Sequence, residues 1–417
     1  MSKKYGDIFT KQKELHKYNI RLLNKKGWHN SDKKIVFDKF KNEKKIMQGF
    51  PYSNSSKLRV KLLLDDSKYN TEFIYFTKKD YIDILNKNPN IFKHDLLFLK
   101  KSNGSQGKHV YPVVSMNDVI KIMEDKYKNC NDNIIFILEK GINNPLLFKE
   151  KKFDMRIYLL FVRKEDKYYS YLYKDWFLRT SNTKYNPNSL SKKNMLTNTS
   201  INGTKTNNQF IYRKISKNKN NDINFDLLNK NLYPCLTFFS EKWKQHLKEA
   251  NFKYFNKELN KGLQFNLFGI DIIIDKNLNP YVLEINYNPA FQAAKANKDI
   301  RKLKKKMWRN IVYNYINHYN NTSSINSKNF IELNNDNIEK CINNDNYESD
   351  ESDESDESDY SNDSNDSDDS DDSDDSDDSD DSDDSDDSDD INDKDNNIFK
   401  EVNILSLFFS LKNKLKL

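Results

Sequence analysis

One stretch of the chain, residues 348–390, has a composition that excludes a folded core. It holds 26 of the 63 acidic residues of the chain and no Lys or Arg. The other residues keep 37 acidic against 69 basic side chains, so they carry a formal charge of about +32 and the stretch carries −26. A block of like charge with almost no apolar side chains cannot offset its ordering entropy, so we expect residues 347–395 to be disordered.

The rest of the sequence excludes several other classes of protein. Cys130, Cys235 and Cys341 are far apart and odd in number, which argues against a disulfide framework and against a Cys-rich zinc site. The N-terminus lacks the apolar core of a signal peptide. The longest apolar stretch near the C-terminus, residues 404–411 within the short amphipathic segment 396–417, is too short to cross a bilayer. We therefore expect a soluble, cytoplasmic protein without a transmembrane segment.

The apolar pattern predicts a mixed α+β chain. Helices are expected at 57–64, 79–87, 116–126, 224–260 and 296–318. Strands are expected at 73–76, 96–99, 133–138, 155–162, 168–173, 269–275 and 281–285. The polar residues 164–167 predict a hairpin between two of these strands, and residues 321–346 are interpreted as an Asn-rich linker.

A second predicted hairpin carries the most informative polar residues. On adjacent antiparallel strands, Asp271 and Glu284 can point to one face, and period-two alternation adds Asn286 to that face. Three oxygen ligands suit Mg²⁺, which binds through a few carboxylates together with waters and substrate phosphates. The hairpin therefore indicates a magnesium site, and the alternative is a half-buried hairpin whose carboxylates cap turns.

Lys100 ends an apolar strand and precedes a loop, residues 102–109, that contains Gly104 and Gly107. A lysine in this position can reach nucleotide phosphates, and the glycine loop can close over them with its backbone amides. The Gly-Lys-Ser/Thr ending of a Walker A loop is missing. In a chain so rich in lysine, a solvated surface lysine beside a turn is the alternative.

A row of charges begins the strand that leads to Val162. Alternation places Lys152, Asp154 and Arg156 on one face of this strand, with apolar residues on the other. The strand is too apolar beyond Arg156 to be an exposed edge. We therefore expect the charged row to line a polar cleft.

Together these residues resemble the tubulin tyrosine ligase and tubulin tyrosine ligase-like family of ATP-grasp carboxylate–amine ligases. The resemblance extends from about Leu22 to Tyr315, and its matching runs are 152–156, 172–175, 178–181, 196–198, 267–271 and 283–286. It implies an α+β chain with an ATP-grasp fold. The implied domains are a small N-terminal domain (1–70), a central domain (71–150) and a catalytic domain (151–320), before the linker and the disordered acidic C-terminal tail.

The resemblance implies three groups of site residues. The nucleotide group consists of Lys100, Glu139, Lys140, Ile142, Lys152 and Asp154. The catalytic group consists of Arg156, Arg179, Asn198 and Glu284. In this group the two arginines handle the acceptor carboxylate and the transferred phosphoryl group, and Asn198 lines the same pocket together with Thr197. The Mg²⁺ ligands are Asp271, Glu284 and Asn286.

The implied activity is the ATP-dependent addition of a free amino acid to a carboxylate of the acidic tubulin tail, through an acyl phosphate. The basic body suits such a tail. The run 178–181 and the short chain favour tyrosine as the added amino acid, with polyglutamylation as the alternative and glycylation third. A non-catalytic binder of acidic tails or nucleic acid is a different class that stays open. A nucleic-acid partner is not expected, and the protein is expected to be a monomer.

Three positions depart from the family pattern. His109 stands where the family has the second glycine of its phosphate loop, Met195 stands where it has a histidine, and Lys205 is the candidate for a lysine that usually follows Asn198.

The acidic tail has two interpretations. Its serines recur at every third position from Ser349 to Ser388 and suit acidophilic kinases. It is either a solubilising spacer or a mimic of the tubulin tail that folds back on the basic cleft.

Overall fold

The structure is a computed structural model that describes residues 28–31, 36–39, 45–48, 57–104, 106–164, 167–202, 208–218, 223–254, 263–287, 289, 298–311, 329–334 and 336. The chain divides into two units, residues 1–346 and 347–417, and every described residue belongs to the first. The predictions for the acidic stretch, for segment 396–417 and for Lys205 lie outside the described residues. Among the described helices, none has the length and apolarity needed to span a membrane.

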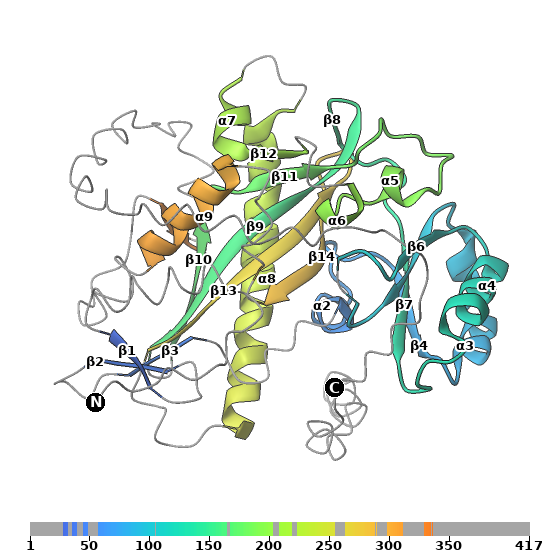
Figure 1. Ribbon diagram of the computed structural model, residues 1–417, viewed down its shortest axis with the longest axis horizontal. Coiled ribbons are helices and arrows are strands. Elements are labelled where there is room, and N and C mark those ends of the chain that lie inside the picture. Colours follow the sequence, from blue (N-terminus) through green and yellow to red (C-terminus); the bar gives the residue numbers. More distant parts are fainter. Residues whose placement is uncertain are drawn as a thin grey trace, which may run out of the picture. The chain divides into compact units, whose positions relative to one another are not determined.

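A four-stranded antiparallel sheet forms the smaller part of the fold (Figure 1). Its strands are β4 (Phe73–Thr77), β5 (Leu97–Lys101), β6 (Val110–Val113) and β7 (Ile135–Lys140), in the order β4-β7-β5-β6. The helices α3 (Tyr81–Lys87) and α4 (Met116–Tyr127) cover one face, together with a 3₁₀ turn at Pro89–Lys93. Helix α4 confirms the helix predicted at 116–126, and it begins with a capping box between Ser115 and Asp118.

Period-two alternation gives this small sheet two different faces. Leu97, Leu99 and Leu138 pack in the core beneath α3 and α4. Lys100 and Glu139, the next residues on the same strands, point to the opposite face and are also buried. The face of the sheet away from its helices therefore carries two buried charged residues beside apolar ones such as Phe98.

The second sheet has eleven strands among the described residues, and its longest members are β9 and β13. Its main order is β1-β2-β3-β13-β9-β10-β15, with β14 on β13, β8 and β11 on β9, and β12 on β11. The bounds are β1 Trp28–Ser31, β2 Val36–Lys39, β3 Lys45–Gln48, β8 Leu147–Phe148, β9 Lys151–Lys164, β10 Lys167–Tyr173, β11 Phe177–Thr180, β12 Gln209–Ile211, β13 Leu263–Ile274, β14 Pro280–Tyr287 and β15 Phe330–Glu332. Both predicted hairpins, β9–β10 and β13–β14, are confirmed as antiparallel pairs.

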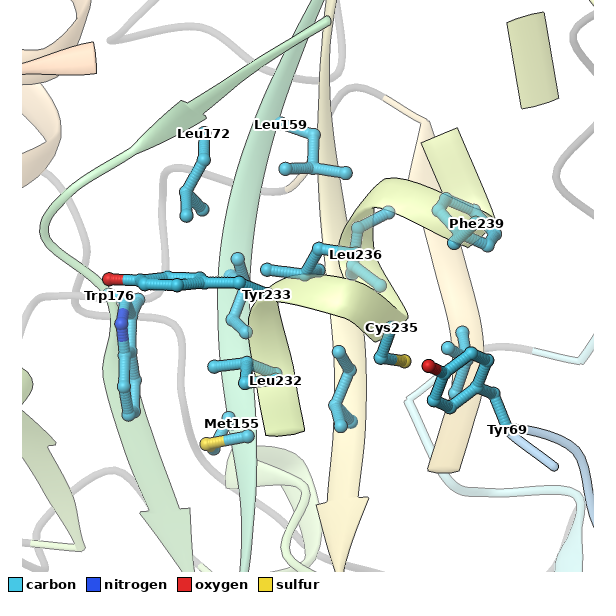
Figure 2. Close-up of a cluster of buried hydrophobic side chains, with 14 of the residues drawn as sticks. Tyr69, Met155, Leu159, Leu172, Trp176, Leu232, Tyr233, Cys235, Leu236 and Phe239 are labelled. Atoms are coloured by element: carbon cyan, nitrogen blue, oxygen red, sulfur yellow. The ribbon is translucent and has the colours of Figure 1, made fainter. Parts of the chain in front are cut away.

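The long helix α8 (Phe225–Tyr254) packs along one face of this sheet (Figure 1). Its buried residues Leu232, Leu236, Phe239 and Trp243 recur every three or four positions, which is the spacing of one helix face. Figure 2 shows this face of α8 packed against side chains of the strands, Met155 among them. The other helices are α2 (Lys57–Leu63), α5 (Lys192–Met195), α6 (Thr199–Asn202), α7 (Tyr212–Ser216) and α9 (Lys298–Asn310).

Strand β9 divides its residues between this core and the opposite face. Phe153 and Met155 belong to the core that α8 covers. Lys152, Asp154 and Arg156 alternate with them and therefore lie on the other face, as predicted from the sequence. The packing of Phe153 and Met155 in the core thus fixes the position of the charged residues on the opposite face of β9.

One prediction about the fold is wrong. Residues 330–332, placed in an Asn-rich linker, form strand β15, which pairs antiparallel with β10. Phe330, Ile331 and Leu333 are 2%, 7% and 1% exposed. This short apolar run adds an edge strand because it buries side chains on the large sheet, and the surrounding asparagines hid it in the composition.

Candidate active site

A pocket is lined by residues of both sheets and by the segments that follow β11. Ten of the twelve predicted site residues line it: Lys100, Glu139, Lys140, Ile142, Lys152, Asp154, Arg179, Asn198, Asp271 and Glu284. The remaining two, Arg156 and Asn286, contact Asp271 directly. Residues that are 186 positions apart in the sequence therefore converge on one site.

Glu139 forms the centre of a buried charge cluster on the small sheet. Its carboxylate pairs with Lys100 and lies 2.8 Å from Lys61 Nζ, which also donates to the hydroxyl of Thr71 at 2.9 Å. Burial alone would raise the pKa of Glu139, but the charges of Lys100 and Lys61 outweigh it and lower the pKa to about 2. The acid is therefore ionised and holds both lysines beside the pocket.

Lys152 comes to the same pocket from β9. Its ammonium lies 5.0 Å from the centre of the Phe98 ring, and the ammonium of Lys100 lies 5.8 Å from the same ring. Burial and then the nearby charge of Lys100 lower the pKa of Lys152 to about 8. Two lysines close to one another, one without a carboxylate partner among the described residues, form a site that suits an anion such as a phosphate.

Two arginines converge on Asp271. Arg156 donates from Nε and Nη2 to its two oxygens at 2.5 and 2.9 Å, and Arg179 Nη2 lies 2.8 Å from Oδ2. Burial would raise the pKa of Asp271, but the two guanidinium groups hold it well below its usual range. An ionised aspartate that is 2% exposed thus fixes both arginines.

Asp154 extends this network. Arg179 donates to its two oxygens at 2.7 and 2.5 Å, and the hydroxyl of Thr197 donates to Oδ2 at 2.8 Å. The register explains the pairing, because Arg179 and Asp154 are opposite residues on β11 and β9. Asp154, which the resemblance places in the nucleotide group, orients Arg179 in this structure.

The β13–β14 hairpin brings together the three predicted Mg²⁺ ligands, Asp271, Glu284 and Asn286. Asp271 and Glu284 are register partners, and the side-chain amide of Asn286 lies 3.2 Å from an Asp271 oxygen and 3.3 Å from Glu284 Oε1. The described residues contain no cluster of three or more His, Cys, Asp or Glu side chains arranged for a metal. Two carboxylates and an amide nevertheless fit Mg²⁺, which takes few protein ligands beside waters and phosphates.

The glycine loop is attached to the short helices beyond β11. Ser200 Oγ donates to the carbonyl of Gln106 at 2.6 Å, and Lys192 Nζ donates to that of Lys108 at 2.7 Å. Gly107 has φ +73°, and a Cβ there would lie 2.8 Å from Asn198 Oδ1, so the close approach to Asn198 requires glycine.

Two of the three departures from the family pattern, His109 and Met195, lie in the described residues. His109 Nδ1 lies 2.9 Å from the hydroxyl of Tyr127, so this side chain anchors the end of the glycine loop on α4. Met195 is 1% exposed in an apolar cluster with Phe98 and Leu196, beside the pocket. Met195 thus forms part of the pocket wall, whereas His109 supports the glycine loop from outside the pocket lining.

Sequence reasoning missed two site residues, Lys57 and Lys61, which both lie on α2. Lys57 Nζ lies 3.1 Å from Glu284 Oε2, and Lys61 pairs with Glu139. Neither stands in a motif, and a single lysine carries little signal in this chain. Lys61 could have been found from its position on the apolar face of a predicted amphipathic helix.

Known proteins share sequence similarity with the part of the chain that contains this site. Residues 61–323, more than half of the chain, match the Tubulin-tyrosine ligase family. Tubulin glycylase 3B of Drosophila melanogaster is 28% identical over 205 residues, which cover 47% of this chain and 26% of the relative. The probable tubulin polyglutamylase TTLL9 of Mus musculus is 30% identical over 172 residues, or 38% of this chain and 34% of the relative.

A third relative, tubulin monoglutamylase TTLL4 of Mus musculus, is 29% identical over 177 residues, which cover 38% of this chain and 14% of the relative. The chain thus spans about a third or less of the length of these relatives. Their names refer to glutamate and glycine and not to tyrosine, so they support the glutamylase alternative better than the tyrosine preference. With the pocket, its charged residues and the matched span, the chain belongs to the tubulin-tyrosine ligase family, whose members are ATP-dependent amino-acid ligases.

Proposed function

We propose that this protein adds glutamate to a carboxylate of the acidic tubulin tail in an ATP- and Mg²⁺-dependent reaction, as a monomer in the cytoplasm. The observation that carries the proposal is the convergence of Arg156 and Arg179 on Asp271 in a pocket that also holds Lys100 and Lys152. Phosphoryl transfer requires aligned reactants and fixed positive charge more than covalent help from the protein. This pocket supplies the fixed positive charge, on side chains that buried carboxylates hold in place.

The reaction that fits these groups has two steps. An acceptor carboxylate oxygen attacks the γ-phosphorus of ATP, the bond to ADP breaks, and an acyl phosphate forms. The amine of the incoming amino acid, after losing a proton, attacks the acyl carbon, and inorganic phosphate leaves as the amide bond forms. Both steps place negative charge on oxygens that cationic side chains can stabilise.

Each group of residues in the pocket has its own role in this reaction. Lys100 and Lys152 bind the nucleotide phosphates, and Glu139, Lys140 and Ile142 border the base. Arg156 and Arg179 stabilise the transferred phosphoryl group and the acceptor carboxylate, while Asp154 and Thr197 orient Arg179. Asp271, Glu284 and Asn286 would hold Mg²⁺, which neutralises phosphate charge when bound.

Glutamate is the amino acid proposed here because two of the three relatives named above are glutamylases and because the site has many cations that suit an acidic substrate. Glycine is the second candidate. The glycylase relative matches 47% of the chain, a larger share than either of those glutamylases matches.

Mass spectrometry of tubulin tail peptides tests this proposal. Purified protein is incubated with tubulin, ATP and Mg²⁺ and with glutamate, glycine or tyrosine in separate reactions, beside a Glu284→Gln control. Glutamate additions that are absent from the control would support the proposal. Additions of glycine or tyrosine alone would assign a different amino acid, and ATP binding without any addition would point to another acceptor.

A further inference from the structure

Lys57 connects two parts of the pocket that are far apart in the sequence. It is the first residue of α2, a helix that contacts β14 (Figure 1). Its ammonium donates a hydrogen bond to the carbonyl oxygen of Gly104 in the glycine loop and lies 3.1 Å from Glu284 Oε2. Its backbone N–H donates to the carbonyl of Ser102 at 3.1 Å. One side chain thus ties the loop to a carboxylate of the proposed metal group.

The ammonium of Lys57 has the partners that a bound cation would have, a carboxylate oxygen and a backbone carbonyl oxygen. The other oxygen of Glu284 accepts from the neutral amide of Asn286. Lys57 is therefore the cation that the described residues place against Glu284. The pair is largely shielded from water, since the side chains of Lys57 and Glu284 are 12% and 21% exposed. A divalent cation on Glu284 would meet this positive charge at close range.

Two other side chains that hold the glycine loop have no contact with the proposed metal ligands. Lys192 and Ser200 each donate to a loop carbonyl, but neither contacts a carboxylate of the metal group. They can hold the loop without responding to a metal ion. Lys57 is the anchor that shares its partner, Glu284, with the proposed cation.

We propose that Lys57 is a positioning residue that couples the glycine loop to the metal site. It holds the loop and balances Glu284 in the nucleotide-free protein, and it releases Glu284 when a divalent cation binds there. The loop then loses one of its anchors as the metal enters. This inference rests on the nucleotide and metal site of the proposed function, and it goes beyond the family resemblance because it concerns a lysine outside the matched motifs.

Mn²⁺ binding to the full chain without nucleotide, followed by electron paramagnetic resonance, tests the coupling. Removing one positive charge a few ångströms from the ion should tighten binding about tenfold in Lys57→Met, whereas Lys57→Arg should bind like the wild type. Lys192→Met is the matched control, because it removes another lysine anchor from the same loop and should leave Mn²⁺ affinity unchanged. Equal Mn²⁺ affinities in Lys57→Met and Lys192→Met would overturn the inference.

Hydrogen exchange of the wild-type protein tests the coupling between the glycine loop and the metal site without any variant. Mn²⁺ alone should raise the exchange rate of amides in residues 102–108 at least about twofold, because these amides depend on an anchor that the ion displaces. Unchanged exchange at saturating Mn²⁺ would contradict the coupling. A wild-type protein that binds no Mn²⁺ would instead refute the metal site of the proposed function, and the absence of glutamate transfer with normal Mn²⁺ binding would refute only the ligase assignment.

Discussion

Asp271 on β13 stands directly opposite Arg156 on β9, and their side chains form two charge-assisted hydrogen bonds of 2.5 and 2.9 Å. On its other side, Asp271 is the register partner of Glu284 on β14. The central strand β13 therefore aligns the proposed catalytic arginine and the proposed metal ligand through one buried aspartate.

Replacing Arg156 with Lys should lower the rate of amino-acid transfer about 100-fold or more. Lysine keeps the charge but cannot form the paired hydrogen bonds that fix Asp271. Arg156→Met should in addition lower the free energy of unfolding by about 3–5 kcal/mol, because it removes one of the two guanidinium partners of a buried carboxylate. Transfer assays and urea unfolding measure the two effects. Arg163→Lys is the control and should keep the transfer rate, because Arg163 lies on the same strand but stacks over the ring of Tyr168, away from Asp271.

Glu139 should make the free energy of unfolding depend on pH in the acidic range. Its pKa is about 2 in the folded protein against an ordinary value of 4.5. A carboxyl with a lowered folded-state pKa stabilises the fold above its unfolded pKa, and this contribution is lost as the pH falls from about 4.5 to about 2. The contribution is of order 3 kcal/mol.

Urea unfolding at several pH values measures this effect, and Glu139→Gln should lack the corresponding change. Glu150→Gln is the control, because Glu150 pairs with Lys184 on the exposed surface and should contribute about 0–1 kcal/mol. The same acid dependence in wild type and Glu139→Gln would contradict the assignment.

Lys152 should make nucleotide affinity fall in mild alkali. Burial and the charge of Lys100 lower its pKa to about 8, so the side chain is protonated below this pH and neutral above it. Loss of this charge should weaken binding of a non-hydrolysable ATP analogue about tenfold between pH 7 and pH 9.5. Fluorescence titration measures the affinity. In Lys152→Arg, which stays charged over this range, the affinity should be nearly constant.

Leu333 should contribute to folding although it lies in a segment that resembles a linker. It is 1% exposed in the core that α8 covers, so Leu333→Ala should lower the free energy of unfolding by about 2–5 kcal/mol. Leu227→Ala is the matched control, because Leu227 on α8 is 47% exposed and should change stability by less than about 0.5 kcal/mol. Equal unfolding midpoints for the two variants would mean that Leu333, which follows β15, adds nothing to the core.

The parts of the site that sequence could predict lie on single strands or on one hairpin. Alternation along β9 was enough to place Lys152, Asp154 and Arg156 on one face. A short turn between β13 and β14 was enough to bring Asp271 opposite Glu284. In both cases the geometry depends on local spacing, which the sequence contains directly.

The parts that sequence could not predict depend on pairing between distant segments. The contact between Arg156 and Asp271 joins residues 115 positions apart, and the one between Lys61 and Glu139 joins residues 78 positions apart. No local pattern specifies which strands become neighbours in a sheet. The abundance of lysine and asparagine further hid Lys57 and β15, because neither differs from its surroundings in composition.

Between Lys152 and Arg156, the side chains of strand β9 alternate between the charged residues of the site and the core that helix α8 covers. Adding or deleting a single residue there would exchange the two faces, sending the charges into the core and Phe153 and Met155 into the pocket. A change of length in this strand should therefore disrupt both the core and the site. New substrate preferences in proteins built this way must arise by substitution, or by length changes in the loops and short helices that border the pocket.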